Sequence, residues 1–415
     1  MEPADAPVSI EPVGAHARRL FREHDLYLRR TYPKQKYLHW PVLREGLGVG
    51  RLLFGLVLLG RPVRRRFGIP LFRQIGDMVR LMRQGVDANC YYFFELYRPG
   101  GLARAAQYLT RFETKNGLLR ALNWKLRPRE NDDNPGDKYL LSQRCRENGL
   151  SAVPVLLLAD GERLDWNGHG PEHLRRDLFL KFRRGKGARG TETVHWTGAA
   201  HRLGDGRLVN EAGLLDHIQA KAKERNRDLM VLPRLVNHPA IADLADRSVM
   251  AMRVITCRDA QDRPEVALAF LRVLGRLESS WAVHPELGAP IDLESGRLGP
   301  FTAELFQWRF FDTFAVHPIN GVAVEGRILP FWRETKELVL AAHRLFPAFV
   351  LFGWDVAITP EGPMILEGNV VPDVNFLQRV FHHGAGETRL GPLLSHQLLL
   401  LERGKDTHAR PVDRG

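Results

Sequence analysis

The sequence predicts an α+β protein in which a mostly helical N-terminal region precedes two or three lobes of strands and helices. The chain has 415 residues, which is too long for one simple core. Hydrophobic residues make up 44% of it and charged residues 26%, as in ordinary folded proteins. Apolar residues recur at helical spacing before residue 123 and alternate as in strands after residue 150.

The formal net charge of +12 raises the question of a nucleic-acid partner. The basic residues are spread along the whole chain, with local clusters at 61–66 and 183–189, and no zinc or RNA-recognition pattern accompanies them. A nucleic-acid partner is therefore disfavoured. Phosphorylated or acidic ligands, or an anionic membrane surface, explain the charge equally well.

The cysteines and the first residues indicate the compartment. The chain has three cysteines, an odd number, and they lie far apart. This argues against a disulfide framework and for a reducing environment. The first residues are acidic and lack the charged-then-apolar order of a signal peptide. We therefore expect a cytoplasmic protein.

The first expected domain is a helical region at residues 1–130. Residues 15–30 are predicted to form an amphipathic helix, and residues 70–123 read as helices around a core of aromatic side chains. The apolar run at 47–60 contains Arg51 and is shorter than the roughly 20 residues that span a bilayer. We favour a buried or packing helix there. The alternative is a peripheral contact of residues 47–66 with the inner face of the membrane.

The second expected domain, residues 131–230, begins after the breaker-rich sequence 131–136. A helix is predicted from Lys138, and a later apolar strand contains Lys181, which needs an anionic partner if it is buried. The glycine-rich turn 183–190 follows this strand and can bring backbone N–H groups close to phosphates. It lacks the Walker A spacing, and a strand rather than a helix follows it.

The third expected domain, residues 231–403, contains a β-hairpin at 353–369 and precedes a polar tail at 404–415. Centring the hairpin turn on Glu361 places Asp355 opposite Glu367, with Asn369 on the same face as Glu367. Two carboxylates facing each other repel unless a cation lies between them, and Mg²⁺ suits these oxygen donors. The alternative is that the acidic side chains simply face water.

These residues resemble a known family. An acidic residue at the end of one strand, followed by Glu-x-Asn on the next, resembles the metal-binding signature of the ATP-grasp superfamily. The longer string Gly-Trp-Asp-Val-Ala-Ile-Thr, then Leu-Glu-Gly-Asn and Pro-Asp, is similar to the sugar-transfer-associated branch. The resemblance covers residues 68–378. It implies an ATP-grasp fold, in which two α/β lobes grip ATP, with two Mg²⁺ ions held by Asp355, Glu367 and Asn369.

The resemblance also implies roles for further residues. Lys138 and Lys181 would bind the ATP phosphates, and Arg253 would face the transferred phosphoryl group and the acyl carbon, so that Arg253 and Lys181 act in catalysis. Other positions implied at the nucleotide are Gly185, Lys186, Gly187 and Arg234. Positions implied at the substrate are His284, His317 and Asp373; for His284, capping a turn is an equal alternative. The sequence departs from the family at 232–233 in the hinge strand and at 370–371.

The implied activity is that of an ATP-dependent carboxylate–amine ligase. It would join a small-molecule carboxylate to an amine through an acyl phosphate, with a sugar acid or a polysaccharide precursor as the acid. Two alternatives stay open: a phosphotransferase acting on a small molecule, and a nucleotide-binding protein without turnover. The intact set of Asp355, Glu367 and Asn369 argues against the second alternative, and the departures from the family pattern keep it open.

Overall fold

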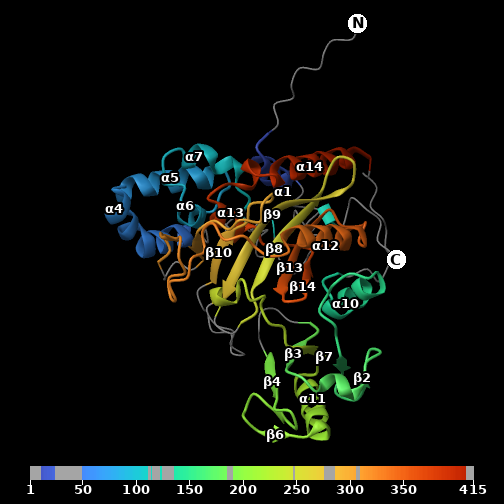
Figure 1. Cartoon of the computed structure of the whole chain (residues 1–415). Helices are drawn as coiled ribbons and strands as arrows, with labels where there is room; N and C mark the ends of the chain where they lie inside the picture. The colour runs from blue at the N-terminus through green and yellow to red at the C-terminus, as the bar shows by residue number, and fades with distance from the viewer. Residues whose placement is uncertain are drawn as a thin grey trace.

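The computed structural model describes residues 11–23, 49–110, 114, 122–123, 135–184, 190–245, 248–274, 286–304 and 309–407. Within this part, the chain forms a helical N-terminal region, a small lobe and a large lobe, and each lobe contains one sheet (Figure 1). The predicted combination of a helical region with α/β lobes is confirmed.

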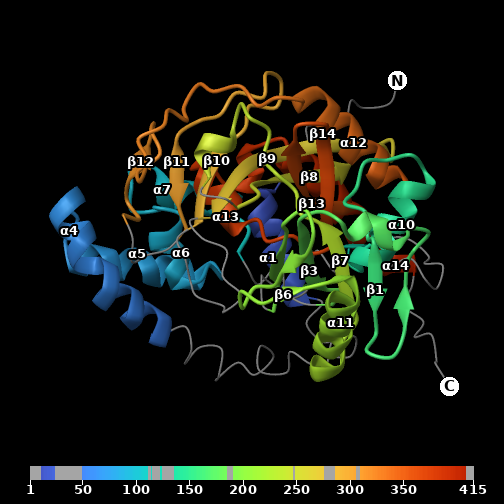
Figure 2. The ribbon, with the colours of Figure 1, turned by 60° about the horizontal axis from the view of Figure 1, so that its bottom comes forward.

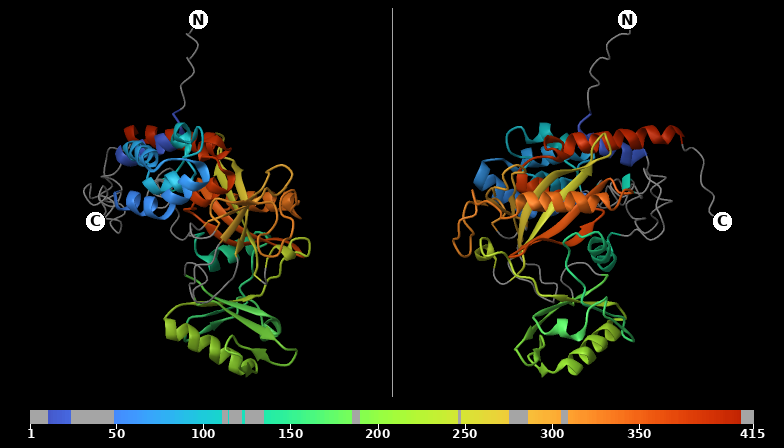
Figure 3. Two further views of the ribbon diagram at one scale, coloured as in Figure 1. Left: turned by 90° about the vertical axis from the view of Figure 1, so that its left-hand side faces the viewer. Right: turned by 45° about the vertical axis from the view of Figure 1, so that its right-hand side comes forward.

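The small lobe lies at the bottom of the molecule in the views of Figures 1 and 3. Its sheet has the order β2-β1-β7-β3-β4-β5-β6. The strands are β1 (Leu157–Ala159), β2 (Leu164–Asp165), β3 (Leu178–Phe182), β4 (Glu192–Trp196), β5 (His201–Arg202), β6 (Leu208–Val209) and β7 (Leu229–Pro233). Helix α11 (Glu211–Arg225) begins at the N-cap Asn210 and buries Leu214, Ile218 and Ala222 in the core of this lobe.

The large lobe is built on an antiparallel sheet of order β12-β11-β10-β9-β8-β13-β14. Its strands are β8 (Ala251–Arg258), β9 (Pro264–Leu274), β10 (Glu286–Pro290), β11 (Phe301–Ala303), β12 (Thr313–Phe314), β13 (Leu351–Thr359) and β14 (Gly362–Asn369). Short 3-10 turns connect elements in both lobes: η4 (Pro171–Leu174), η5 (Ala242–Leu244) and η6 (Ala385–Glu387).

Helices cover both faces of the large sheet. Alternate side chains of β8 point to opposite sides: Met252 and Val254 join the core under one layer, whereas Ile255 and Cys257 join the core under the other. The first layer is α12 (Trp332–Arg344); the second consists of α1 (Val13–Glu23), α13 (Asn375–Phe381) and α14 (Leu390–Thr407). Arg253 and Asp355 therefore lie on the second face of the sheet. Helices α13 and α14 cover this face over strands β8 to β11.

The N-terminal region packs beside the large lobe, with α4 farthest from the small lobe's sheet (Figure 2). After a helical stretch at 49–55, its elements are η2 (Leu56–Gly60), α4 (Arg61–Phe67), α5 (Leu71–Arg83), α6 (Ala88–Phe93), α7 (Gly101–Arg104) and η3 (Ala105–Gln107). Tyr91, Tyr92 and Tyr97 are buried in its core, so the predicted structural role of these aromatic residues is confirmed. No helix in the described ranges is long and apolar enough to cross a membrane.

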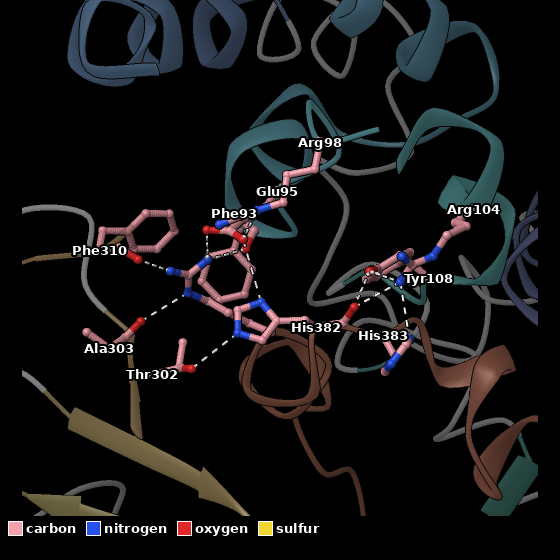
Figure 4. Close-up of polar contacts among 11 residues, drawn as sticks. Phe93, Glu95, Arg98, Arg104, Tyr108, Thr302, Ala303, Phe310, His382 and His383 are labelled. Atoms are coloured by element: carbon pink, nitrogen blue, oxygen red, sulfur yellow. Dashed lines mark hydrogen bonds and ion pairs between the residues drawn. The ribbon is translucent and has the colours of Figure 1, made fainter. Parts of the chain in front are cut away.

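A buried ionic cluster joins the N-terminal region to helix α13 (Figure 4). The guanidinium of Arg379 donates hydrogen bonds to backbone oxygens of Phe93, at 2.8 Å, of Ala303, at 3.0 Å, and of Phe310. Glu95 lies 3.9 Å from Arg379 and accepts a 2.6 Å bond from Arg98.

The side chain of Glu95 is ionised in this cluster. Burial raises the pKa of Glu95, but hydrogen bonds from His382 and Arg98, with the charge of Arg379, lower it to about 2. The cluster links the N-terminal region to α13, the helix that follows the hairpin of β13 and β14.

Helix α10 (Lys138–Glu147) packs with the large lobe, although the sequence-based division placed residues 131–230 together. Its Leu141 and Cys145 lie in the core beneath α12. The chain then runs beside β14: the backbone N–H of Val153 donates to the oxygen of Ile365, and the N–H of Ile365 donates to Ser151, both at 3.0 Å. The small lobe proper therefore begins at β1.

Candidate active site between the two lobes

The hairpin of β13 and β14 places Asp355 directly opposite Glu367, as predicted from the sequence. The turn itself differs from the prediction. Thr359 pairs with Gly362, so the turn has two residues and is not centred on Glu361. A register shift between Asp355 and Val356 then brings the two carboxylates face to face. Gly362 has a φ of 133°, a value that suits glycine and fixes the end of this tight turn.

Asp355 pairs with two arginines, Arg253 on the adjacent strand β8 and Arg272 on the next strand, β9. Nε and Nη2 of Arg253 lie 2.5 and 3.1 Å from the two carboxylate oxygens, and Nη1 of Arg272 lies 3.7 Å away. Burial raises the pKa of Asp355, but the charges of Arg253 and Arg272 outweigh it and hold the pKa below its usual range. The carboxylate is therefore ionised, and its two bonds to Arg253 fix the orientation of the guanidinium.

Glu367 joins the two lobes electrostatically. Its Oε2 lies 3.5 Å from Nζ of Lys138, at the first turn of α10, and 3.5 Å from Nζ of Lys181, on β3 of the small lobe. Burial lowers the pKa of Lys181, and the charge of Lys138 lowers it further, whereas Glu367 raises it. Two ammonium groups share one carboxylate, so this point carries an excess of positive charge.

Charged side chains continue as a row across one face of the large sheet. Arg272 on β9 forms a bidentate ion pair with Glu286 at the start of β10, at 2.5 and 3.0 Å. The row runs from β10 to β14 and ends at the small lobe: Glu286, Arg272, Arg253, Asp355, Glu367, Lys138 and Lys181. The carboxylate of Glu304 also acts on Arg272, and the cations without a close bidentate partner, Lys138 and Lys181, lie at the end of the row next to the small lobe.

Asn369 lies two residues beyond Glu367 on β14 and completes the predicted oxygen donor set. Its Nδ2 is buried without a hydrogen-bond partner among the described residues. An amide nitrogen donates hydrogen bonds and does not bind Mg²⁺, so only the Oδ1 atom of Asn369 belongs to the donor set. No group of three His, Cys, Asp or Glu side chains suited to a metal occurs in the described ranges. Two carboxylates and one amide nevertheless fit Mg²⁺, because phosphates and water complete its shell.

The sequence-based reasoning missed the residues that position Lys138. Asp137 caps helix α10 by accepting bonds from the backbone N–H groups of Tyr139 and Leu140. Arg183, which directly follows β3, reaches both oxygens of Asp137 at 2.9 Å and stacks on the ring of Tyr139. An aspartate directly before a predicted helix was the available signal for the cap, but its arginine partner lies 46 positions away.

Three other candidate residues lie in described parts of the chain. Arg234 follows β7 and binds Asp177 at 3.1 Å. Asp373 lies two residues before α13 and accepts a 3.0 Å bond from the backbone N–H of Asn375. His317 packs against Phe301 of β11, and its Nδ1 accepts from the backbone N–H of Ile319 at 3.3 Å. β11 is four positions along the sheet from β13, so the structure does not place His317 beside Asp355.

The ligand roles of Arg234, Asp373 and His317 stay predictions. Four further candidates, Gly185, Lys186, Gly187 and His284, lie outside the described residues.

Comparison with solved structures gives distant matches to D-alanine–D-alanine and D-Ala:D-Ser ligases. A D-alanine–D-alanine ligase from Coxiella burnetii matches with 10% identity and a TM-score of 0.35, covering 66% of this chain and 62% of the ligase. A D-alanine–D-alanine ligase from Bacillus anthracis matches with 12% identity and a TM-score of 0.36, over 66% of this chain and 69% of that one. The VanG D-Ala:D-Ser ligase of Enterococcus faecalis matches with 13% identity and a TM-score of 0.38, over 64% of this chain and 61% of the ligase.

The chain thus spans less than two thirds of the Coxiella burnetii and Enterococcus faecalis ligases that it matches. A search of curated proteins gives no match. The sequence model of the sugar-transfer-associated ATP-grasp family matches residues 120–389, which is more than half of the chain and includes the whole charged row. The protein therefore belongs to the sugar-transfer-associated ATP-grasp family and has an ATP-grasp fold.

Proposed function

We propose that this protein is an ATP-dependent carboxylate–amine ligase that forms an amide through an acyl phosphate. Membership of the ATP-grasp family supports ATP binding and a ligase activity. The observation that carries the proposal is the convergence of Lys138 and Lys181, from different parts of the fold, on Glu367 of the hairpin. We take these two cations to be the groups that neutralise the phosphates of a nucleotide held between the lobes.

The residues divide into those that hold the nucleotide and those that act on the acceptor. Lys138 and Lys181 bind the phosphate tail. Asp355, Glu367 and Asn369 would hold Mg²⁺, which supplies further charge neutralisation on the phosphate oxygens. Arg253 is oriented by Asp355 at 2.5 Å, so its guanidinium has a fixed direction before any ligand arrives.

The proposed reaction has two steps. An oxygen of the substrate carboxylate first bonds to the γ-phosphorus of ATP as the bond to the ADP oxygen breaks. The amine nitrogen then attacks the acyl carbon, the bond from that carbon to the phosphate oxygen breaks, and the amine loses its proton to solvent. Arg253 stabilises the charge on the phosphoryl oxygens in both steps. Arg253, Lys181 and the other cations need only position groups and offset charge, and no dedicated general base is required.

A sugar acid or an acidic polysaccharide precursor is the proposed carboxylate. The description of the family supports a link to sugar transfer. The net charge of +12 is consistent with an acidic polymer as a ligand.

The test is ATP turnover by the full chain with pooled sugar acids, pooled amines and Mg²⁺, with hydroxylamine added as a trap. We expect a hydroxamate, with ADP and free phosphate formed in equal amounts. Glu367→Gln should reduce turnover by more than about 100-fold, because one of the two carboxylates at the metal site is lost. Glu361→Gln, in the exposed turn of the same hairpin, should have no effect.

Other outcomes point elsewhere. A phosphorylated product with ADP but without free phosphate identifies a kinase, which would use the same cations. ATP binding without turnover for any acid and amine would support a nucleotide-binding protein without catalytic activity. Accumulation of AMP would contradict the acyl-phosphate route.

A further inference from the structure

Exposed apolar side chains gather on two helices of the N-terminal region. Fourteen large hydrophobic residues are exposed in the described part of the chain, and half of them lie within residues 49–79. These seven are Val49, Leu53, Phe54, Val57, Phe72, Ile75 and Val79. Their spacing makes one stripe on the helical stretch from 49 and one on α5. Val57 is 82% exposed and Phe72 is 78% exposed, so the stripes face solvent.

The opposite faces of the same helices are fixed in a core. Leu59, Val63, Met78 and Leu81 are buried there. The side chain of Gln74 crosses between the helices, since its Nε2 donates to the backbone oxygen of Gly60 at 3.0 Å. The exposed stripes are therefore held by a packed helix pair and cannot turn inward without breaking that core. The segment 47–60 was expected to form a buried or packing helix. One side of it does pack in this core through Leu59, whereas Val49, Leu53, Phe54 and Val57 are exposed.

The charge around the two stripes is mostly positive. Residues 49–83 contain eight arginines and one acidic residue, a formal excess of seven positive charges. Two carboxylates from outside this range pair with its arginines, Asp87 with Arg51 and Asp312 with Arg66, and reduce the excess to five. The acidic residue, Asp77, is buried and accepts a bond from the hydroxyl of Tyr91 at 3.2 Å. Seven of the arginines are exposed: Arg61, Arg64, Arg65, Arg66, Arg73, Arg80 and Arg83. Exposed apolar stripes bordered by arginines have the chemistry of a helix that lies at a lipid surface.

We propose that these two helices dock on an anionic membrane surface. The apolar side chains enter the boundary between headgroups and acyl chains, and the arginines bind lipid phosphates. A second copy of the chain is a poorer occupant, because a two-fold contact would bring the two sets of positive charges together. A nucleic acid would match the arginines but would leave the apolar stripes unpaired. The inference extends the peripheral contact considered for residues 47–66 to α5.

The experiment is sedimentation of the full chain with vesicles. One set contains phosphatidylcholine alone, and the other adds phosphatidylglycerol to about one third, which gives an anionic surface. We expect binding to the anionic vesicles only, and release by about 0.5 M NaCl. The double variant Val57→Glu/Phe72→Glu should weaken binding by at least about 10-fold, as should Arg64→Glu/Arg65→Glu.

Matched controls test whether vesicle binding depends on this surface or on any exposed apolar or basic side chain. Ile319→Glu changes an equally exposed apolar residue, at 70%, in the large lobe. Arg333→Glu reverses a comparably exposed arginine, with 79% of its side chain accessible, on α12. Both should bind vesicles like the parent chain, and all variants should keep its unfolding temperature, because the changed residues are exposed.

Three results would overturn the proposal. The first is no binding to anionic vesicles at low salt. The second is equal loss in the control variants and in the test variants. The third is a parent chain that is dimeric in solution and becomes monomeric with Val57→Glu/Phe72→Glu while vesicle binding is unchanged, because the stripes would then be a contact between copies.

Discussion

Single ion pairs determine how the site holds a nucleotide, and Lys181 is the clearest case. It lies on a strand of the small lobe, yet its ammonium is 3.5 Å from a carboxylate of the large lobe. Lys181→Ala should weaken the binding of ATP by about 2 kcal/mol, or about 30-fold, because the phosphate tail loses a partner. The affinity for adenosine, which has no phosphates, should not change. Calorimetry with both ligands measures this.

Lys221→Ala is the matched control for Lys181→Ala. Like Lys181, Lys221 pairs with a carboxylate, but both partners lie in the small lobe: Lys221 is on α11 and Glu192 is on β4. It should leave the affinity for ATP unchanged. Equal loss of ATP and adenosine in Lys181→Ala would mean that the lysine supports the fold and does not bind phosphate.

A second prediction for a single residue concerns Arg272 and the pH dependence of ATP binding. With Arg253, it holds the pKa of Asp355 below its usual range. Arg272→Met removes one of these charges, so the pKa of Asp355 should rise. Mg²⁺-dependent ATP binding, which needs the ionised carboxylate, should then be lost at a higher pH than in the parent chain. Calorimetric titrations across the acid range measure this shift.

Arg272→Lys should restore most of the parent profile, because the positive charge is kept. An unchanged acid limit in Arg272→Met would show that Arg253 alone sets the pKa of Asp355. Arg389→Met, which removes an exposed arginine paired with Glu265, should not move the limit.

At the scale of elements, the junction between the N-terminal region and α13 depends on buried Glu95. Its pKa is about 2 against an ordinary 4.5, which corresponds to about 3 kcal/mol of stability. A lowered carboxylate pKa stabilises the fold fully above about pH 4.5, and this contribution is lost as the pH falls toward 2. Glu95→Gln should therefore lower the free energy of unfolding near neutral pH and flatten its acid dependence.

Urea unfolding, followed by circular dichroism at several pH values, tests this. Glu265→Gln removes a surface pair with Arg389 and should cost less than about 1 kcal/mol. A parent-like stability of Glu95→Gln at neutral pH would contradict the assignment of the cluster as the tie between these elements.

The hairpin shows which part of an element can be predicted from sequence. Alternation along a strand and a short turn are local, so the facing of Asp355 and Glu367 could be predicted. The register shift beside Val356 could not, because it depends on how β13 fits the neighbouring strand. The contacts of Arg379 were equally hidden, since its backbone partners come from segments 69 to 286 positions away.

For the whole molecule, the two lobes were predicted, but the packing of α10 was not. Its sequence position suggests the small lobe, whereas Leu141 and Cys145 enter the large core. Periodicity shows which face of a helix is apolar and does not show which core receives it. The resemblance to a family named Lys138, Lys181 and Glu367 as parts of one site, and the structure brings these three side chains together; their roles as ligands stay predictions.

The placement of Lys181 predicts how ATP changes the dynamics of the molecule. ATP should tie the small lobe to the large lobe, since its phosphates would contact cations of both. Amide hydrogen exchange in β3 and β7 should slow with ATP, whereas exchange in β8 and β9 should not change. Lys181→Ala should abolish most of the slowing. Equal slowing throughout the chain would indicate general stabilisation and not a link between lobes.

The short segment 151–153 beside β14 has a consequence for the behaviour of the protein at high concentration. A sheet edge with free N–H and C=O groups can pair with another chain and begin aggregation. Of the four edge strands in the two described sheets, β2, β6 and β12 have only two residues each. The fourth, β14, has eight, and its centre at Ile365 is already hydrogen-bonded on the outer side by Ser151 and Val153. The connection that leads into the small lobe therefore also blocks the longest edge from strand exchange between molecules.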